Sequence, residues 1–279
     1  MEAAMEKKNI EMQAINRQTF GQRLKSYKCS PLSLVLLILV SASALLTVMT
    51  LLFLLAYILI KGIPYLTPSL FAWEYTTENV SLMPALVNTV VMTGLSLLIA
   101  VPLGIFAAIY LVEYAKRGNR LVSIVRITAE TLTGIPSIVY GLFGMLFFVT
   151  ALHWGLSLLS GAFTLVIMIL PLIMRTAEEA LKSVPDSYRE ASFGLGAGKL
   201  RTIFTIVLPS AVPGILAGVI LAIGRVIGET AALIYTAGTV AEVPKNLMGS
   251  GRTLALHMYV LSCEGLHINQ AYATAVILL

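Results

Sequence analysis

Two charged residues, Arg225 and Glu229, lie inside an apolar run of the sequence, 211–236, in the stretch LAIGRVIGETAAL. A charge at the centre of a bilayer costs at least about 2.5 to 3.5 kcal/mol on insertion scales, so an intramembrane charge is by default a hypothesis of function. At a spacing of four residues, the two side chains share one face of a helix and can neutralise each other. A purely structural ion pair is therefore the alternative interpretation.

The chemistry that Arg225 offers is recognition of an oxyanion. A guanidinium is permanently charged and presents a planar fork of donors that matches two oxygens of a carboxylate, sulfate or phosphate. Our hypothesis is that Arg225 lines an anion pathway, and that Glu229 holds the arginine between anions and so tunes or gates the pathway. Arg175 ends the preceding apolar run; a place at the inner mouth of the pathway and snorkelling to the interface explain it equally well.

The sequence offers little for enzyme chemistry. No paired carboxylates, nucleophile–base set or metal cluster falls within the apolar runs. The two cysteines, Cys29 and Cys263, fall on opposite sides of the expected membrane and cannot pair, and no Cys/His cluster accompanies them. We therefore predict a protein that is not an enzyme, without catalytic, cofactor-binding or metal-binding residues.

The segments that must position the charges are transmembrane helices. Of the 279 residues, 58% are hydrophobic and only 12% are charged, and a helix needs about 20 apolar residues to cross about 30 Å of hydrocarbon. A sixth run begins near Gln270 and stops at Leu279. We expect an all-α membrane protein of about six transmembrane helices, the last of them truncated. The five runs of sufficient length are 31–60, 86–112, 127–152, 156–174 and 211–236.

Prolines and glycines within these runs carry further expectations. Pro102, Pro136 and Pro171 each remove a backbone hydrogen bond and should bend their helices. In the run 211–236, two pairs of glycines are spaced four residues apart, and small residues at this spacing allow another helix to approach closely. We expect both pairs to pack against a neighbouring helix; they are Gly214 with Gly218 and Gly224 with Gly228.

Charge placement predicts the orientation in the membrane. Fifteen of the nineteen lysines and arginines fall in the N-terminal tail and in the loops after the second and fourth runs, and three fall on the other side. Because Lys and Arg are retained in the cytoplasm, the N-terminus should be cytoplasmic. This asymmetry also accounts for the net charge of +5 without a nucleic-acid partner. We divide the chain into a cytoplasmic tail, 1–30, and a transmembrane domain, 31–279.

A polar loop, 175–209, interrupts the apolar runs on the cytoplasmic side. Ser187 and Glu190 have the spacing of a capping box, which predicts a short helix beginning after Ser187. Three glycines between 194 and 198 predict a turn, 199–207 can form a second helix, and Pro209 marks the entry to the next span. The loop does not bind ATP, because Phe193 and Leu200 stand where a phosphate-binding loop needs Gly and Ser or Thr.

The same loop carries a motif of fixed spacing over twenty residues. The matching residues are Glu190, Ala191, Gly196, Ile206, Leu208 and Pro209, with Ser192 in a position usually held by a small alanine. In this pattern the loop resembles the EAA loop of permeases of ATP-binding cassette (ABC) importers. That resemblance implies a type I importer permease fold in which the loop 175–209, between spans 4 and 5, forms a coupling helix that docks on a cytosolic ATPase.

The likeness extends over about residues 83–236, where segments such as GIPSIVYGLFG and AIGRVIGETAALIYTAG resemble the phosphate importer permeases, PstA more than PstC. It implies phosphate as the substrate and a site in the bacterial inner membrane. Implied partners are a PstC-like second permease, two PstB-like ATPase subunits that bind ATP and Mg²⁺, and an extracytoplasmic PstS-like phosphate-binding protein. By position, Arg225, Glu229 and Arg175 match family residues associated with phosphate passage.

Two other functions stay open on the sequence. A permease for sulfate, molybdate or tungstate would carry the same kind of loop. A channel or membrane scaffold that recruits a cytosolic partner without pumping is a different class, and the spacing of the EAA residues argues against it. Competition between anions for uptake distinguishes a phosphate permease from a permease for another oxyanion. Co-purification with an ATPase subunit distinguishes an importer permease from a channel or scaffold.

Overall fold

The structure of the chain is a computed structural model that describes residues 31–116 and 118–279; the expected tail, 1–30, lies outside the described residues. All regular secondary structure within the described ranges is helical. The chain divides into two units, 1–57 and 58–279. In the first unit, helix α2 (Pro31–Gly62) exposes nearly all its apolar side chains as far as Tyr57. Such a surface suits lipid or another membrane helix.

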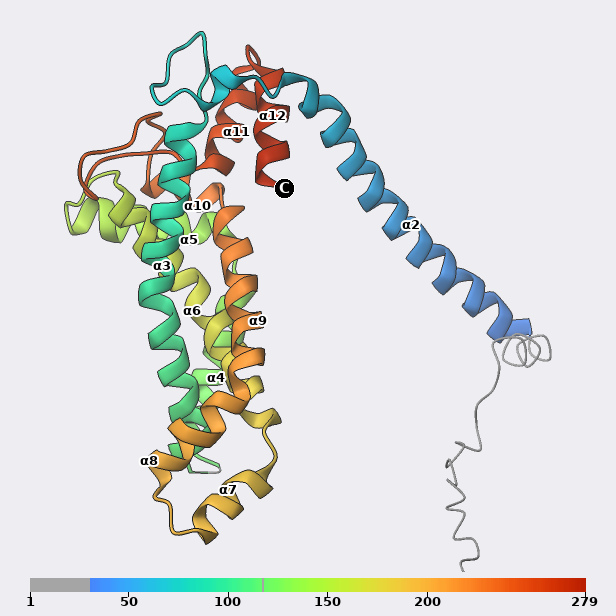
Figure 1. Cartoon of the computed structure of the whole chain (residues 1–279), viewed down its shortest axis with the longest axis vertical. Coiled ribbons are helices and arrows are strands. Elements are labelled where there is room, and N and C mark those ends of the chain that lie inside the picture. The colour runs from blue at the N-terminus through green and yellow to red at the C-terminus, as the bar shows by residue number, and fades with distance from the viewer. Residues whose placement is uncertain (1–30, 117) are drawn as a thin grey trace, which may run out of the picture. The chain divides into compact units, whose positions relative to one another are not determined.

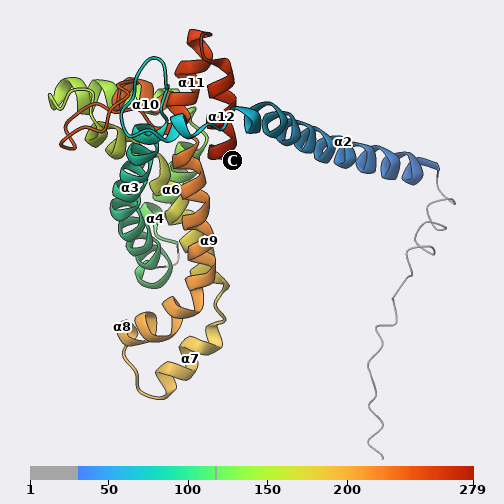
Figure 2. The ribbon, with the colours of Figure 1, turned by 45° about the horizontal axis from the view of Figure 1, so that its top comes forward.

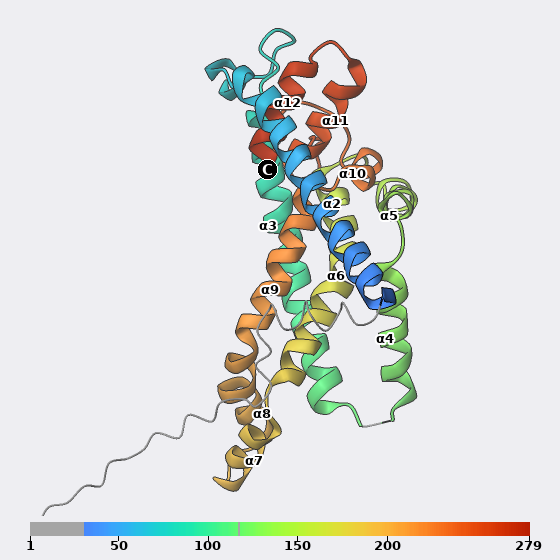
Figure 3. The same cartoon turned by 90° about the vertical axis from the view of Figure 1, so that its right-hand side faces the viewer.

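Three long helices form the centre of the second unit. They are α3 (Met83–Ile109), which continues into a π-helical turn, η3 (Tyr110–Tyr114), α6 (Leu158–Ser183) and α9 (Leu208–Ile227). Figure 1 and Figure 3 show them side by side, with α6 against both neighbours. In the most apolar stretch of α6, 67% of the residues are buried, whereas the share is 33% in the span that begins with α3 and 28% in the span that ends in α9. The central helix is therefore α6.

A fifth membrane segment is broken. Helix α4 (Arg120–Thr133) meets α5 (Ser137–Gly144) and the π-helical η4 (Met145–Ala151) at a bend of 103°. The bend falls at Gly134–Pro136, so the expected effect of Pro136 is confirmed, whereas Pro102 and Pro171 lie inside α3 and α6 without ending them. The short helix α10 (Ala231–Thr236) packs on α5, and Figure 2 shows it near α11.

Among the residues described, four helices are long and apolar enough to cross a membrane, or five if the bent pair counts as one span. The expected all-α membrane architecture is thus confirmed. The sixth expected segment is α12 (Ile268–Leu278), an apolar helix of 11 residues that packs beside α11 (Leu254–Glu264). The loop helices η1 (Ile63–Tyr65) and η2 (Pro68–Phe71) complete this end of the unit.

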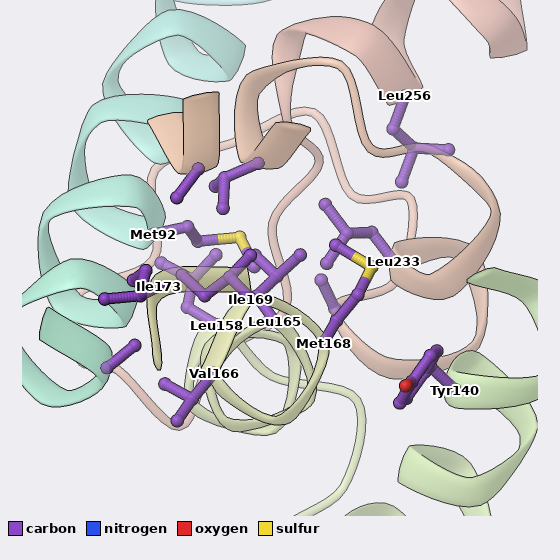
Figure 4. Close-up of a cluster of buried hydrophobic side chains, with 14 residues drawn as sticks. Met92, Tyr140, Leu158, Leu165, Val166, Met168, Ile169, Ile173, Leu233 and Leu256 are labelled. Carbon is purple, nitrogen blue, oxygen red and sulfur yellow. The ribbon is translucent and has the colours of Figure 1, made fainter. Parts of the chain in front are cut away.

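Apolar side chains pack tightly around α6. Figure 4 shows Met92 and Ile173 between α3 and α6, with Ile169 close to both. Leu165, Ile169 and Leu233 are fully buried, and each such side chain contributes roughly 1.5 to 3 kcal/mol relative to an exposed one in water. Because lipid is itself apolar, the packing in the membrane depends on close contact between the helices. The core thus fixes how α3, α6 and α9 lie relative to one another.

Only one of the two glycine pairs packs as expected. A Cβ atom added to Gly214 would lie 2.7 Å from Cβ of Ala180, and one added to Gly218 would lie 2.6 Å from Cβ of Thr176, so this pair lets α9 approach α6. The second pair was wrongly assigned to packing. Nothing lies within 4 Å of a Cβ added to Gly224, and Gly228 ends α9.

The contact at Gly218 gives a direct test of this packing. Gly218→Ala should lower the melting temperature of the purified chain in detergent, because the new methyl group collides with Thr176. The expected loss of folding free energy is the roughly 1–3 kcal/mol typical of overpacking. Gly224→Ala is the matched control. It should leave the melting temperature unchanged or raise it, because alanine favours a helix by about 1 kcal/mol over glycine. Equal destabilisation by both variants would contradict the assignment.

Candidate functional site

The polar loop folds as two short helices joined by a turn, at the end of the molecule opposite α11 and α12 (Figure 1). The first, α7 (Asp186–Gly194), begins after Pro185, which occupies the N-cap position without a side-chain cap. The expected capping box is therefore wrong, because Ser187 lies inside the first turn. The second consists of α8 (Lys199–Thr202) and a π-helical turn, η5 (Ile203–Val207), as expected for 199–207.

The two arms of the loop are tied by hydroxyl groups. The Oγ of Ser192, which is buried, lies 2.8 Å from Oγ1 of Thr202, and the Ala197 amide donates to the Ser192 carbonyl. Gly196 has φ of +81°, a left-handed conformation that glycine adopts without strain. Ser192 and Gly196 thus serve as internal supports of the turn, as their small size in the motif suggests.

Other residues of the motif face outward. Glu190 and Ala191 are exposed, and Leu195, at the tip of the turn, is 90% exposed. Phe193 and Leu200 beside it are also exposed large apolar side chains. Between the arms lies a cavity of about 540 Å³, to which Ala191, Ser192, Gly196 and Ile206 all contribute. Leu208 and Pro209 form the first turn of α9. An apolar tip on a polar loop is the kind of surface that docks on a partner.

Arg189 anchors α7 to the membrane helices, and sequence reasoning missed this role. Its Nε and Nη2 donate to Oε1 of Glu113 in η3 at 3.0 and 2.8 Å. Nη1 donates to the carbonyl of Val184 at 2.8 Å and to Oδ1 of Asp186 at 3.1 Å, and Nη2 also donates to the carbonyl of Leu181, near the end of α6, at 3.0 Å. The side chains of Arg189 and Glu113 are only 14% and 10% exposed. Through this one residue, α7 is held to both α3 and α6.

A second contact joins the loop to the same turn. The Nζ atom of Lys199, at the start of α8, lies 4.8 Å from the centroid of the Tyr114 ring in η3, which is a cation–π arrangement. Glu113 and Tyr114 directly follow the expected span 86–112, and nothing in the sequence there pointed to the loop. The π-helical widening of η3 places both side chains within reach of the two arms.

Glu229 is not paired with Arg225, contrary to expectation. Helix α9 ends at Ile227, so the two residues do not share a helix face. Oε1 of Glu229 instead accepts a hydrogen bond of 3.0 Å from the Ala232 amide in the first turn of α10. Carboxylates are favoured there because the first amides of a helix have no backbone acceptor. The glycine at 228, which ends α9, was the signal that the helix would not continue.

Arg225 is partly buried, and among the described residues its side chain has no hydrogen-bond or ion-pair partner. The contacts of Gly214 with Ala180 and of Gly218 with Thr176 fix the antiparallel register of α9 and α6. Continued by two turns, this register brings Arg225 level with Ile169, about 17 Å along α6 from Leu158. A guanidinium with free donors therefore lies near the middle of the apolar layer.

Arg175 lies in a different setting. Its guanidinium is paired with Glu179 at 3.2 Å and Glu130 at 3.3 Å, and its side chain is 51% exposed. Along α6 it lies about 9 Å from the level of Arg225, towards the end that carries α7 and α8. The structure thus does not bring Arg175 and Arg225 into one site.

A further buried charge near Arg175 was not singled out from the sequence. Glu178 is 5% exposed on α6, and its Oε1 lies 2.7 Å from Arg126 of α4 and 2.6 Å from Lys182 one turn along α6. The pair Glu178 and Lys182 has the favourable order for a helix, Glu four residues before Lys, which is the signal that could have found it. The cluster fixes α4 to α6.

Comparison with known proteins identifies the family. Residues 100–279 match the family described as "Binding-protein-dependent transport system inner membrane component". The chain belongs to this family. It is therefore a multi-pass component of the inner membrane that serves an ABC importer as its permease and is not catalytic, as the EAA residues indicated. Among the described residues, no group of three or more His, Cys, Asp or Glu could hold a metal ion.

Curated relatives give finer comparisons. A probable ABC transporter permease protein, YqgI of Bacillus subtilis, is 34% identical over 231 residues, which cover 76% of each chain. Phosphate transport system permease protein PstA 1 of Mycobacterium tuberculosis is 43% identical over 154 residues, or 55% of this chain and 50% of the relative. PstA of Pasteurella multocida is 41% identical over 181 residues, which cover 63% of each chain. The chain spans about half to two thirds of these PstA relatives.

Solved structures confirm the expected type I permease fold. A bacterial ABC transporter involved in the import of the acidic polysaccharide alginate gives a TM-score of 0.62 at 17% identity, over 92% of each chain. An inward-facing form of the MetNI methionine ABC transporter gives a TM-score of 0.53 at 21% identity, over 70% of this chain and 84% of the other. At these identities the likeness speaks for the fold alone.

The anchor at Arg189 can be tested by hydrogen exchange. Arg189→Gln should speed amide exchange across α7 and lower the stability of the chain by about 3 to 5 kcal/mol, because it leaves Glu113 as a nearly buried charge without its partner. Glu190→Gln, one residue along on the exposed side, is the control and should leave exchange unchanged. If α7 exchanged at the wild-type rate in Arg189→Gln, the residue would not be the anchor.

Proposed function

We propose that this chain is the PstA-like permease subunit of an ATP-driven importer of inorganic phosphate. The observation that carries the proposal is the unpaired guanidinium of Arg225 at mid-depth in an apolar helix bundle. A permanent charge in that place is stabilised by an anion, and its fork of donors suits a tetrahedral oxyanion. The identity of 41–43% to phosphate permeases supports phosphate as that anion.

In this proposal the end that carries α7 and α8 faces the cytoplasm, as does the N-terminus. The excess of Lys and Arg in the tail and in the loops at that end supports this orientation. A PstC-like permease completes the pathway, two PstB-like ATPases bind ATP and Mg²⁺, and a PstS-like protein delivers phosphate from outside. Leu195 and its apolar neighbours dock on the ATPase, and the exposed Glu190 and Ala191 complete that surface.

Coupling follows from the contacts of the loop. When the ATPases close, they move α7, and Arg189 transmits the movement to Glu113 in η3 and to the end of α6. Because α6 packs tightly on α3 and α9, the three helices move together and carry Arg225 between inward-facing and outward-facing positions. Arg175 lies nearer the cytoplasmic end of α6, where phosphate leaves the pathway. Its charge is neutralised by Glu130 and Glu179, so a phosphate must compete with these two carboxylates to bind it.

The role of Arg225 can be tested with the complex in proteoliposomes. Arg225→Gln should abolish ATP-driven uptake of labelled phosphate, because it removes the charge and the fork, while ATPase binding is unchanged. Arg175→Gln is the comparison and should reduce uptake less. Competition by sulfate, molybdate or tungstate as strong as that by unlabelled phosphate would overturn phosphate as the substrate, and full uptake by Arg225→Gln would overturn the site.

The docking surface can be tested separately. Leu195→Asp should weaken co-purification of the ATPase subunits and lower uptake about tenfold or more, because it places a charge in an apolar contact that is desolvated on docking. Leu266→Asp, which alters an exposed leucine in the loop between α11 and α12, is the control. Wild-type recovery of the ATPase with Leu195→Asp would place the contact elsewhere on the loop.

A further inference from the structure

A cluster of buried polar side chains lies at the end of the molecule that carries α11. Arg252 and Thr253 are 4% and 2% exposed, and Asn88 and His257 are fully buried. The Asn88 amide donates to the Arg252 carbonyl at 3.3 Å, and the Tyr75 ring joins Arg252 and His257, with its centroid 4.8 Å from the guanidinium carbon and 6.2 Å from the imidazole ring. These side chains come from α3, α11 and the loop before each of these helices.

The cluster concentrates unsatisfied polar atoms. Buried side-chain atoms without a hydrogen-bond partner include Nε and Nη2 of Arg252, Oγ1 of Thr253 and Oδ1 of Asn88, whereas the His257 ring interacts with the backbone of Val80. Buried polar groups in proteins are nearly always hydrogen-bonded, and each exception calls for an explanation such as a bound ion. So many in one place indicate a binding site.

The unsatisfied atoms of Arg252 have a specific geometry. Nε and Nη2 form one edge of the guanidinium, where two N–H bonds point in parallel towards a pair of oxygens. The Tyr75 ring covers the flat face of the group and leaves that edge available. No carboxylate within the described residues forms an ion pair with Arg252, and the nearby Glu242 contributes its backbone carbonyl, to Asn88.

Arg252 is also the only formal charge in the cluster, as far as the described residues extend. Burial, together with the neighbouring Arg252, lowers the pKa of His257 to about 3, so its imidazole is neutral at physiological pH. The threonine hydroxyl can donate to an anion, whereas the one N–H of a neutral His257 is taken by the Val80 backbone. The other ring nitrogen and the Asn88 carbonyl can accept from a protonated anion oxygen. The cluster therefore combines one positive charge with further donors and acceptors, which matches a hydrogen phosphate.

We propose that Arg252, Thr253, His257 and Asn88 form a second oxyanion site, at the outer end of the pathway, that binds phosphate before it reaches the level of Arg225. The four residues are buried in this structure, and the Tyr75 ring packs against Arg252. The inference rests on the proposed function for the identity of the anion and for its outer location. The need of Arg252 for an anion stands independently of both.

The test is equilibrium binding of labelled inorganic phosphate to the purified transporter complex without nucleotide. All variants are made in an Arg225→Gln background, so that the deeper site is silent. Arg252→Gln and Thr253→Val should each weaken phosphate binding by about tenfold or more, as expected for lost hydrogen bonds to a charged ligand. Lys245→Gln, which removes an exposed charge from the loop before α11, should leave binding unchanged.

Folding is checked by thermal melting without phosphate. Arg252→Gln should melt no lower than its background, because it removes a buried unpaired charge, and the near-isosteric Thr253→Val gives a second variant if Arg252→Gln fails to fold.

Identical binding isotherms for the background and for both variants would overturn the site, as would equal displacement of phosphate by chloride. Arg252-dependent binding of sulfate but not phosphate would support the site and overturn phosphate as the substrate. Unaltered phosphate binding in these variants, together with normal phosphate uptake by Arg252→Gln in a complex that keeps Arg225, would overturn the site and leave the proposed function standing.

Discussion

The cost of an unpaired charge in an apolar medium shapes this structure more than any other constraint. Among the described residues, most ionised groups near the helix bundle are neutralised locally. Glu178 lies between Arg126 and Lys182, and Glu113 meets Arg189. These pairs also do structural work, since each joins elements far apart in the sequence: α4 to α6, and the loop to α3. Two arginines, Arg225 and Arg252, have no such partner of opposite charge among the described residues, and a bound oxyanion would supply one.

The pairs also explain how a soluble loop can move a membrane bundle. A loop attached to its neighbours only through the chain would absorb a displacement by bending. Here Ser192 and Thr202 tie the two arms together, and Arg189 ties the first arm to α3 and α6 at once. Because the anchor is nearly buried, its bonds are little weakened by water. The close packing around α6 then extends the rigid unit to the level of Arg225.

The sequence was a good guide where the physics is local. Apolar length predicted the long spans, Pro136 predicted the bend, and the glycines near 196 predicted the turn of the loop. It failed where an outcome depends on tertiary partners. Spacing alone could not show that Gly218 faces Thr176 while Gly224 faces no described residue, or that Glu229 caps α10. The partnership of Arg189 with Glu113 spans 76 positions, and no local pattern encodes it. The cluster around Arg252 escaped notice because its members come from separate segments.

The arginines also differ in a way that fits directional movement of an anion. Among the described residues, Arg252 is buried without a carboxylate partner, Arg225 is partly buried and unpaired, and Arg175 is paired with two glutamates. An anion that binds an unpaired guanidinium gains the whole of the charge interaction, whereas one that binds a paired guanidinium must displace carboxylates first. Affinity should therefore fall from the end of the molecule that carries α11 to the end that carries α7. A pathway with weak binding at its exit releases its cargo readily, and movement of the helices is then needed mainly to close one end before the other opens.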